Sequence, residues 1–168
     1  PLRVIRAMAP HFRERKSGTI FNTSSIAAQH SFYGLSIYSA SKHALTGFTE
    51  GLRDELRHFG VRVCDVEPGP FKTAFYDQGM KSENVIHDYE ELRKTLPKRV
   101  MPWPWEDNVK GAQLMIDAND SDELPLHLFL GKVAMDVVRG DLKRTLDEID
   151  AYYEMCSHCG AELKEPPK

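Results

Sequence analysis

The chain has 168 residues, of which 41% are hydrophobic and 28% are charged, so its composition is that of a globular domain rather than a disordered or fibrous protein. Its formal charge is -3, with 22 basic and 25 acidic residues, and this balance argues against a polybasic surface for nucleic acid. No apolar run reaches the roughly 18 residues of a membrane span and no signal-peptide pattern opens the chain, so we expect a single cytoplasmic domain without a membrane partner.

The first predicted element is an amphipathic helix over residues 2–15. Apolar side chains recur there at spacings of three and four, which indicates one buried helix face. They are Leu2, Ile5, Met8 or Ala9, and Phe12. Pro10 lacks a backbone N–H, so we expect it to kink or loosen this helix. The next run, TIFNTSS (19–25), is short, β-branched and apolar at its start, which predicts a buried strand of about five residues.

A long helix and a second strand are predicted next. From residue 36 to 59 the apolar positions return to helical spacing, and Gly60 supplies a C-terminal stop. The face expected to be buried consists of Ala40, Ala44, Leu45, Phe48, Leu52, Leu56 and Phe59. Residues 61–70, VRVCDVEPGP, place valines around a central cysteine and end in Pro-Gly-Pro, which predicts a strand. Strand, helix and strand with short connections are typical of a parallel crossover unit.

The remaining chain is less regular at first. Residues 74–105 carry several aromatic and proline residues, and we predict a long connection with a weak helix over 83–95. A helix over 106–118 and a short strand over 124–131 follow, and then a helix over roughly 133–155. The tail, 156–168, is polar and rich in proline, and we expect it to be mobile.

Within the long helix, the stretch SIYSASKHAL places Tyr38 and Lys42 one helical turn apart. Side chains at i and i+4 share a helix face, so the ammonium can lie near the phenol. A nearby cation favours the phenolate and lowers the pKa of tyrosine, which makes the hydroxyl usable as a general acid or base. The residues between the two are small and leave room for another molecule against this face. Alone, the spacing is also that of a solvated tyrosine beside a surface lysine.

Polar residues at strand ends strengthen the chemical interpretation. Ser25 ends the first predicted strand 13 positions before Tyr38, and EPGP with Thr73 follows the second. Ligands of open α/β sheets bind outside the carboxyl ends of the strands, so these residues are expected at one sheet edge. A hydroxyl at Ser25 can donate to a substrate carbonyl as negative charge develops on its oxygen.

These motifs resemble the C-terminal half of a classical short-chain dehydrogenase/reductase. The resemblance covers residues 2–131 and rests on NTSS, the 13-residue offset, YSASK with the helix after it, and EPGPFKT. It implies a doubly wound, Rossmann-like α/β fold and an NAD- or NADP-dependent interconversion of an alcohol and a carbonyl compound. It also implies a homodimer or homotetramer paired through helices 2–15 and 38–58. The residues to which it assigns roles are Tyr38 as acid/base and in cofactor binding, Lys42 on the nicotinamide ribose, Ser25 on the substrate carbonyl, Pro68, Gly69 and Thr73 on the nicotinamide, and Asn22 and Ser24 in shaping the strand end.

The sequence departs from the family at its start. No glycine-rich turn for a cofactor pyrophosphate is present, since Gly47 and Gly51 lie inside the long helix. We therefore expect a fragment in which residues 1–155 form the second half of a Rossmann-like domain and 74–105 the substrate loop. Such a chain is expected to bind dinucleotide poorly and to be marginally stable alone. The alternative is a non-catalytic remnant that acts as an interaction module or does not fold independently.

Structural interpretations stand beside the functional ones. Ser25 and Thr73 are also typical helix caps, and Gly69 a typical turn residue. Cys64 alternates with valines, which predicts a small buried hydrophobe. Cys156 and Cys159 lack a second ligand pair, so we expect neither a metal site nor a disulfide framework. An aromatic group either lines a substrate pocket or belongs to ordinary packing, and it consists of Phe75, Tyr76, Trp103 and Trp105.

Overall fold

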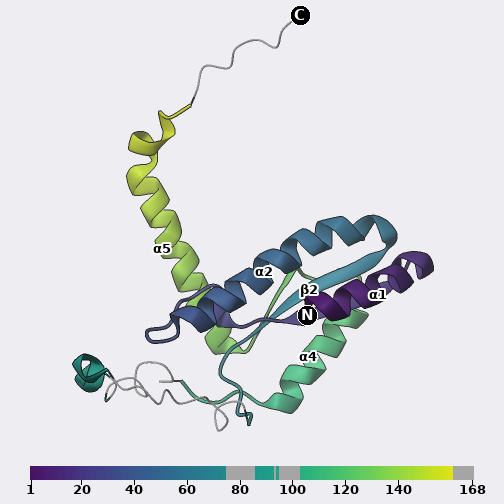
Figure 1. Ribbon diagram of the computed structural model, residues 1–168, viewed down its shortest axis with the longest axis horizontal. Coiled ribbons are helices and arrows are strands. Elements are labelled where there is room, and N and C mark those ends of the chain that lie inside the picture. The colour runs from purple at the N-terminus through teal and green to yellow at the C-terminus, as the bar shows by residue number, and fades with distance from the viewer. Residues whose placement is uncertain (75–85, 93, 95–102, 161–168) are drawn as a thin grey trace, which may run out of the picture.

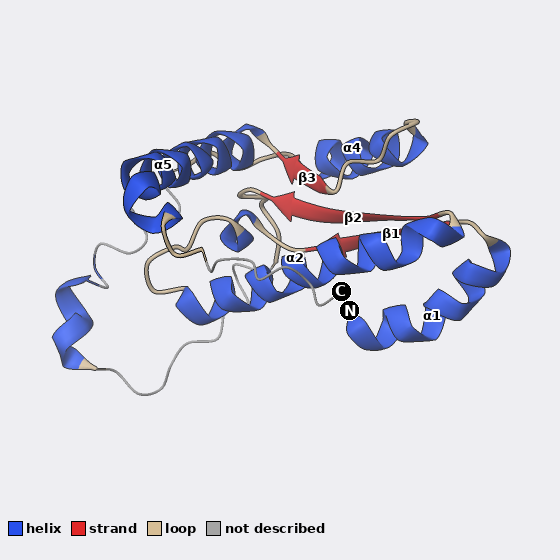
Figure 2. Ribbon diagram, turned by 90° about the horizontal axis from the view of Figure 1, so that it is seen from above, coloured by secondary structure: helices blue, strands red, loops and turns tan. Residues whose placement is uncertain are grey.

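The computed structural model describes residues 1–74, 86–92, 94 and 103–160. Its centre is a parallel sheet of three strands in the order β1-β2-β3, with β1 at Gly18–Thr23, β2 at Val61–Pro68 and β3 at His127–Leu130. Register pairs Asn22 with Asp65 across β1 and β2, and Asp65 with His127 across β2 and β3. Because all three strands are parallel, their carboxyl ends meet at one edge of the sheet (Figure 2).

Helices cover both faces of this sheet (Figure 1). On one face, α1 (Leu2–Arg15) and α2 (Ser36–Leu56) pack around Ile5, Ile20 and Val63. On the other, α4 (Asn108–Asp120) contributes Met115 to a cluster around Cys64. Alternation along β2 produces this division, since Val63 and Cys64 point to opposite faces. The predicted doubly wound α/β class is therefore confirmed.

The predicted helices are found, but the buried faces differ from the expected ones. In α1, Ile5 and Ala9 are buried while Leu2 is 54% exposed, and the helix continues through Pro10. In α2, the expected Ala40 and Ala44 are exposed. The residues of α2 that are buried are Ser39, Thr46, Thr49, Leu52 and Leu56. The prediction failed in the first half of α2 because Thr46 faces the buried carboxyl of Asp65 in β2, to which it donates, rather than an apolar side chain.

Shorter elements complete the chain. Two 3-10 turns, η1 (Ile26–Ala28) and η2 (Arg57–Phe59), flank α2, and Gly60 ends the second with a positive φ of 67°. Phe59, which was expected in the core, is 41% exposed. Of the weak helix expected over 83–95, the structure describes η3 (His87–Tyr89) and the helical residues directly after it. The last helix, α5 (Lys132–Ser157), ends two residues beyond the predicted boundary at 155. No helix in the described ranges has the length and hydrophobicity of a membrane span.

Candidate active site

A cavity of about 400 Å³ lies at the carboxyl ends of β1 and β2. Its volume is within the range of small-molecule sites. Seven of the eight residues to which the resemblance assigned roles line it: Ser24, Ser25, Tyr38, Lys42, Pro68, Gly69 and Thr73. The eighth, Asn22, does not line the cavity; it is buried and donates through Nδ2 to Thr49 Oγ1 at 2.9 Å. The remaining walls come from Thr23, Phe71 and Leu130, and from four residues of α4. The expected convergence of the motifs on one sheet edge is thus observed.

Ser25 reaches this cavity from the turn after β1. The Ser24 amide donates to the Val66 carbonyl at 2.8 Å, which holds the turn against β2. Ser25 then caps η1, because its hydroxyl oxygen accepts a bond of 3.1 Å from the Ala27 amide. The interpretation of Ser25 as a helix cap is therefore confirmed. A serine hydroxyl that accepts one bond still has a hydrogen to donate, so the cap is compatible with a second role.

Tyr38 and Lys42 lie in the first two turns of α2, and they share a face as their spacing predicted. The Lys42 Nζ lies 5.8 Å from the centroid of the Tyr38 ring and donates to the Thr23 carbonyl at 3.1 Å. Burial lowers the pKa of the Lys42 ammonium below its ordinary value of 10.5, and the negative charge of Asp65 opposes this shift. The bond to Thr23 ties the ammonium to the end of β1, where the cavity begins.

The end of β2 forms the opposite wall. The Gly69 amide donates to the Leu130 carbonyl at 3.0 Å, and a Cβ on Gly69 would lie 3.3 Å from the Ala134 nitrogen. The φ of Gly69 is not positive, so its backbone conformation does not by itself require glycine. Glycine is favoured here because a side chain would crowd the start of α5. Thr73 lines the cavity, and the segment that it was suggested to cap begins in 75–85, which lies outside the described residues.

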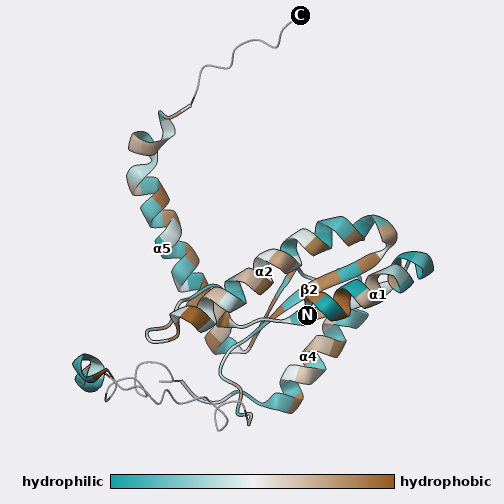
Figure 3. Cartoon of the chain, in the orientation of Figure 1, coloured by the Kyte–Doolittle hydropathy of each residue, from teal (hydrophilic) through white to brown (hydrophobic). Residues whose placement is uncertain are grey.

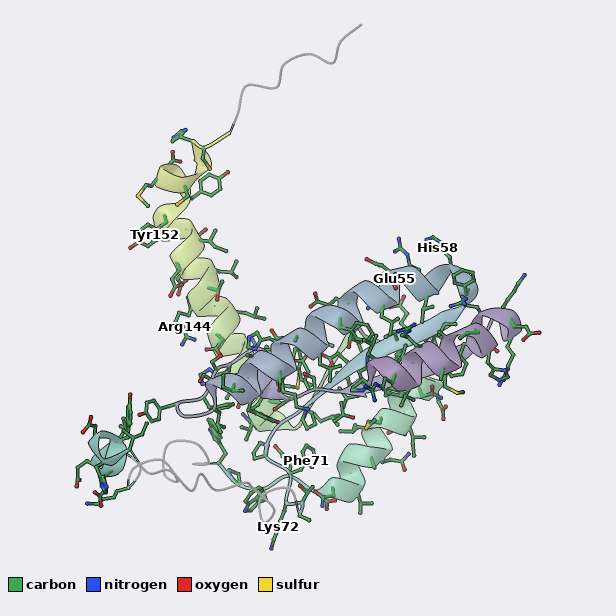
Figure 4. The ribbon with its side chains drawn as sticks, in the orientation of Figure 1. Glu55, His58, Phe71, Lys72, Arg144 and Tyr152 are labelled. Atoms are coloured by element: carbon green, nitrogen blue, oxygen red, sulfur yellow. The ribbon has the colours of Figure 1, made fainter. Side chains whose placement is uncertain are left out.

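One wall was missed from the sequence. Figure 4 shows Phe71 and Lys72 on the connection that leaves β2, beside the start of α4. The Phe71 ring packs so closely on Gly111 that a Cβ there would lie 2.7 Å from it, and Asn108 donates through Nδ2 to the Lys72 carbonyl at 2.7 Å. The sequence signal was a glycine inside a helical run, which often marks close packing.

Known proteins resemble this chain in both sequence and fold. The family model described as short chain dehydrogenase matches residues 1–84. The chain belongs to the short-chain dehydrogenase family. It is 47% identical over 79 residues to oxidoreductase claN of Passalora fulva, a match that covers 47% of this chain and 36% of claN.

Solved structures of the family extend the likeness beyond the matched residues. A short-chain dehydrogenase from Streptomyces avermitilis superposes with a TM-score of 0.81 and 34% identity, covering 96% of this chain and 59% of that one. A short chain dehydrogenase from Burkholderia cenocepacia, solved in complex with NADP, has the same fold at a TM-score of 0.61 and 23% identity, covering 92% of this chain and 55% of its own. The chain therefore spans less than two thirds of the length of each.

Behind the cavity, this family member carries a buried polar network that the sequence did not reveal. Thr46 donates through Oγ1 to Asp65, and the Ser24 hydroxyl lies 3.0 Å from the same Oγ1. Asp65 is 0% exposed, and burial raises its pKa to about 6 although the Thr46 bond acts in the opposite direction. Ser24 and Thr46 thus link a buried carboxyl to the strand end that forms the cavity wall.

A second buried carboxyl lies two residues further along β2. Glu67 is 0% exposed, its Oε1 lies 2.7 Å from Nδ1 of His127, and burial raises its pKa. Potential ligand atoms of Asp65, Glu67 and His127 all lie within 4.8 Å of one another. Within the described residues, Asp65 Oδ1 and Glu67 Oε2 have no hydrogen-bond partner. The search for metal-ligand spacing missed this group because its members come from two different strands.

Other residues of interest lie away from the cavity. Cys64 is 0% exposed, as expected of a buried hydrophobe, and burial raises the pKa of its thiol to about 12. Cys156 and Cys159 are free and exposed. Trp103 packs edge-on against Phe32 with ring centroids 5.9 Å apart, which fits the packing interpretation. Trp105 is 47% exposed and does not line the cavity, while Phe75 and Tyr76 lie outside the described residues.

Proposed function

We propose that Ser25, Tyr38 and Lys42 are the catalytic set of an NAD(P)-dependent oxidoreductase that interconverts a small alcohol and its carbonyl compound. One observation carries the proposal: a hydroxyl, a phenol and an ammonium from two elements line one cavity at the carboxyl edge of a parallel sheet. Family membership supports the reaction class.

The cavity fits one end of a dinucleotide. Lys42 offers a cation for ribose hydroxyls, and Pro68, Gly69 and Thr73 form a wall that admits close approach of a flat ring. When bound there, the nicotinamide would exchange a hydride with the substrate carbon. A glycine-rich turn for the pyrophosphate is absent from these 168 residues, so the proposal concerns a polypeptide that contains such a turn together with this chain. The choice between NAD and NADP stays open.

The roles of the three side chains follow from their chemistry. Ser25 donates its hydroxyl hydrogen to the substrate oxygen and fixes its position. Tyr38 gives a proton to that oxygen during reduction and removes it during oxidation. The Lys42 ammonium, 5.8 Å from the Tyr38 ring, stabilises the negative charge that the phenol acquires when its proton leaves.

We also propose that the protein assembles through α1 and α2, as the family resemblance implies. Apolar side chains on these helices face solvent, including Val4 at 67% and Ile37 at 84% exposure. Apolar side chains that are exposed in a single chain can be buried in an interface between two copies.

The test is the Tyr38→Phe variant, made in the longest product of the gene that contains this chain. We expect kcat to fall about 10²- to 10⁴-fold, the usual contribution of a general acid or base, while NAD(P)H still binds by fluorescence titration. Tyr33→Phe is the matched control, since Tyr33 is 45% exposed and does not line the cavity. Unchanged turnover in Tyr38→Phe would refute the proton-transfer role. Failure of the wild type to bind either cofactor would favour the non-catalytic remnant.

A further inference from the structure

The last helix leaves the body of the protein halfway along its length (Figure 1). Its first turns are anchored, because Val133, Ala134 and Val138 are buried and His30 bonds to Asp141. From residue 142 to 157 every side chain is exposed. We call residues 142–157 the free half of α5. It is about 24 Å long. An isolated helix of this length is marginal in water, so a surface that covers one side of it would stabilise it.

The free half of α5 carries an apolar stripe rather than a uniformly polar surface (Figure 3). Leu142, Leu146, Ile149 and Tyr153 follow one another at spacings of four, three and four, which places them on one helix face. They are between 52% and 61% exposed. In the body the same helix buries apolar side chains of this spacing. The stripe therefore has the pattern of a packed face, with no described residue packed over it.

Charges beside the stripe are divided by sign along the helix. Arg139 and Lys143 precede Leu146, whereas Asp150 and Glu154 follow it. All four lie on the same side of the stripe, about 60–120° around the helix from Leu142. The sequence midpoint of Arg139 and Glu154 lies between residues 146 and 147, and the midpoint of Lys143 and Asp150 lies at the same place. When a second copy of the helix runs in the opposite direction about that point, each of these basic residues lies opposite an acidic one.

We propose that the free half of α5 pairs with the same segment of a second copy of this chain, antiparallel and centred between residues 146 and 147. In an antiparallel pair, the charged side of one stripe faces the charged side of the other. Arg139 of one copy then lies opposite Glu154 of the second copy, and Lys143 lies opposite Asp150. The two-fold symmetry repeats each of these contacts once. Such a two-fold contact is self-complementary and closes as a dimer. A parallel pair would instead bring the two acidic ends together. The bond of 2.9 Å from Lys143 to Asp147 does not compete strongly, because exposed pairs contribute little.

This surface is separate from the one proposed on α1 and α2, so the test must report the contact itself. Leu146→Cys is made in the full chain with Cys156→Ser and Cys159→Ser, which leaves only the buried Cys64. Under mild oxidation a disulfide-linked dimer is expected, because the two positions meet near the symmetry axis within disulfide reach. Arg144→Cys in the same background is the control. Arg144 lies about 160° around the helix from both Leu142 and Leu146, on the side away from the stripe, so it should stay unlinked.

The direction of pairing is tested by charge exchange and by the native cysteine. Lys143→Glu places like charges opposite Asp150 in both symmetric contacts and should weaken association about tenfold by sedimentation. Adding Asp150→Lys should restore it, since the pair is then inverted. Equal disulfide linking of Arg144→Cys and Leu146→Cys would overturn the proposal. It would also be overturned if the double variant, Lys143→Glu with Asp150→Lys, associated as weakly as Lys143→Glu alone. In the antiparallel pair the two Cys156 positions are about 28 Å apart, so a Cys156 disulfide between wild-type chains would also overturn it.

Discussion

The carboxyl edge of the sheet and the free half of α5 both carry patterns that a sequence displays plainly, yet the structure completes only one of them. At the edge, Ser25 and Lys42 are fixed by bonds to neighbouring elements, and residues from three strands and two helices line a cavity. In the free half of α5, four regularly spaced apolar side chains remain exposed. A sequence pattern forms a site when other elements of the same chain pack around its residues. It indicates an interface when no element of the chain packs over them.

Beyond the loss of turnover expected of Tyr38→Phe, the sharpest contrast is in stability. Leu52 is 7% exposed within the cluster of α1, α2 and β2, so Leu52→Ala should lower the free energy of unfolding by about 2–5 kcal/mol. Leu146 is 59% exposed, so Leu146→Ala should cost the single chain less than about 0.5 kcal/mol. Urea unfolding at several protein concentrations separates the two, because the effect of Leu146→Ala should grow with concentration. If Leu52→Ala and Leu146→Ala lost the same free energy of unfolding at low protein concentration, the predicted difference between the two regions would be wrong.

The second-largest difference is expected between a buried and an exposed carboxylate, in how much neutralising each one changes the free energy of unfolding. The folded pKa of Asp65 is raised to about 6 from 3.8, so its contribution to stability is greatest below pH 4 and is lost as the pH rises through 6. Asp65→Asn removes that charge and should raise the free energy of unfolding at pH 7.5 by about 2–3 kcal/mol, with no gain near pH 4. Asn can still accept the bond from Thr46.

The control for this comparison lies in the free half of α5. Asp147 is 62% exposed beside Lys143, so Asp147→Asn should change stability by less than about 0.5 kcal/mol at either pH. Denaturant titrations at the two pH values check both variants. A destabilised Asp65→Asn at pH 7.5 would show that the network requires the negative charge.

The smallest predicted difference compares one substitution in two helices. Gly140 of α5 has open space around it, so Gly140→Ala should stabilise the chain by about 0.5–1 kcal/mol through helix propensity. In α4, a Cβ at Gly111 would lie 2.7 Å from Phe71, so Gly111→Ala must displace that ring. We expect its propensity gain to be cancelled and the cavity to be reshaped, which thermal melts and KM would report. A gain in Gly111→Ala equal to that in Gly140→Ala would show that the contact is easily relieved.

Prediction from the sequence succeeded where local pattern decides the outcome. The helices over 2–15 and 36–56, and the strands after each, lie close to their predicted bounds because spacing and turn residues set them locally. It failed for the inner face of α2, where Ala40 and Ala44 are exposed and Thr46 is buried. The partner of that face is Asp65, and no periodicity within α2 records what lies opposite it.

The sequence by itself determined the fold class, the separation of Tyr38 and Lys42 by one helical turn, and the resemblance on which their roles rest, since all three depend on the order of residues along the chain. Only the tertiary structure decided that Phe71 closes the cavity against Gly111, that Asp65, Glu67 and His127 gather under α2, and that half of α5 stands free. The physical reason is that burial and contact are properties of pairs of elements distant in sequence. Their energies depend on separation in space, which the local propensities of a single segment do not contain.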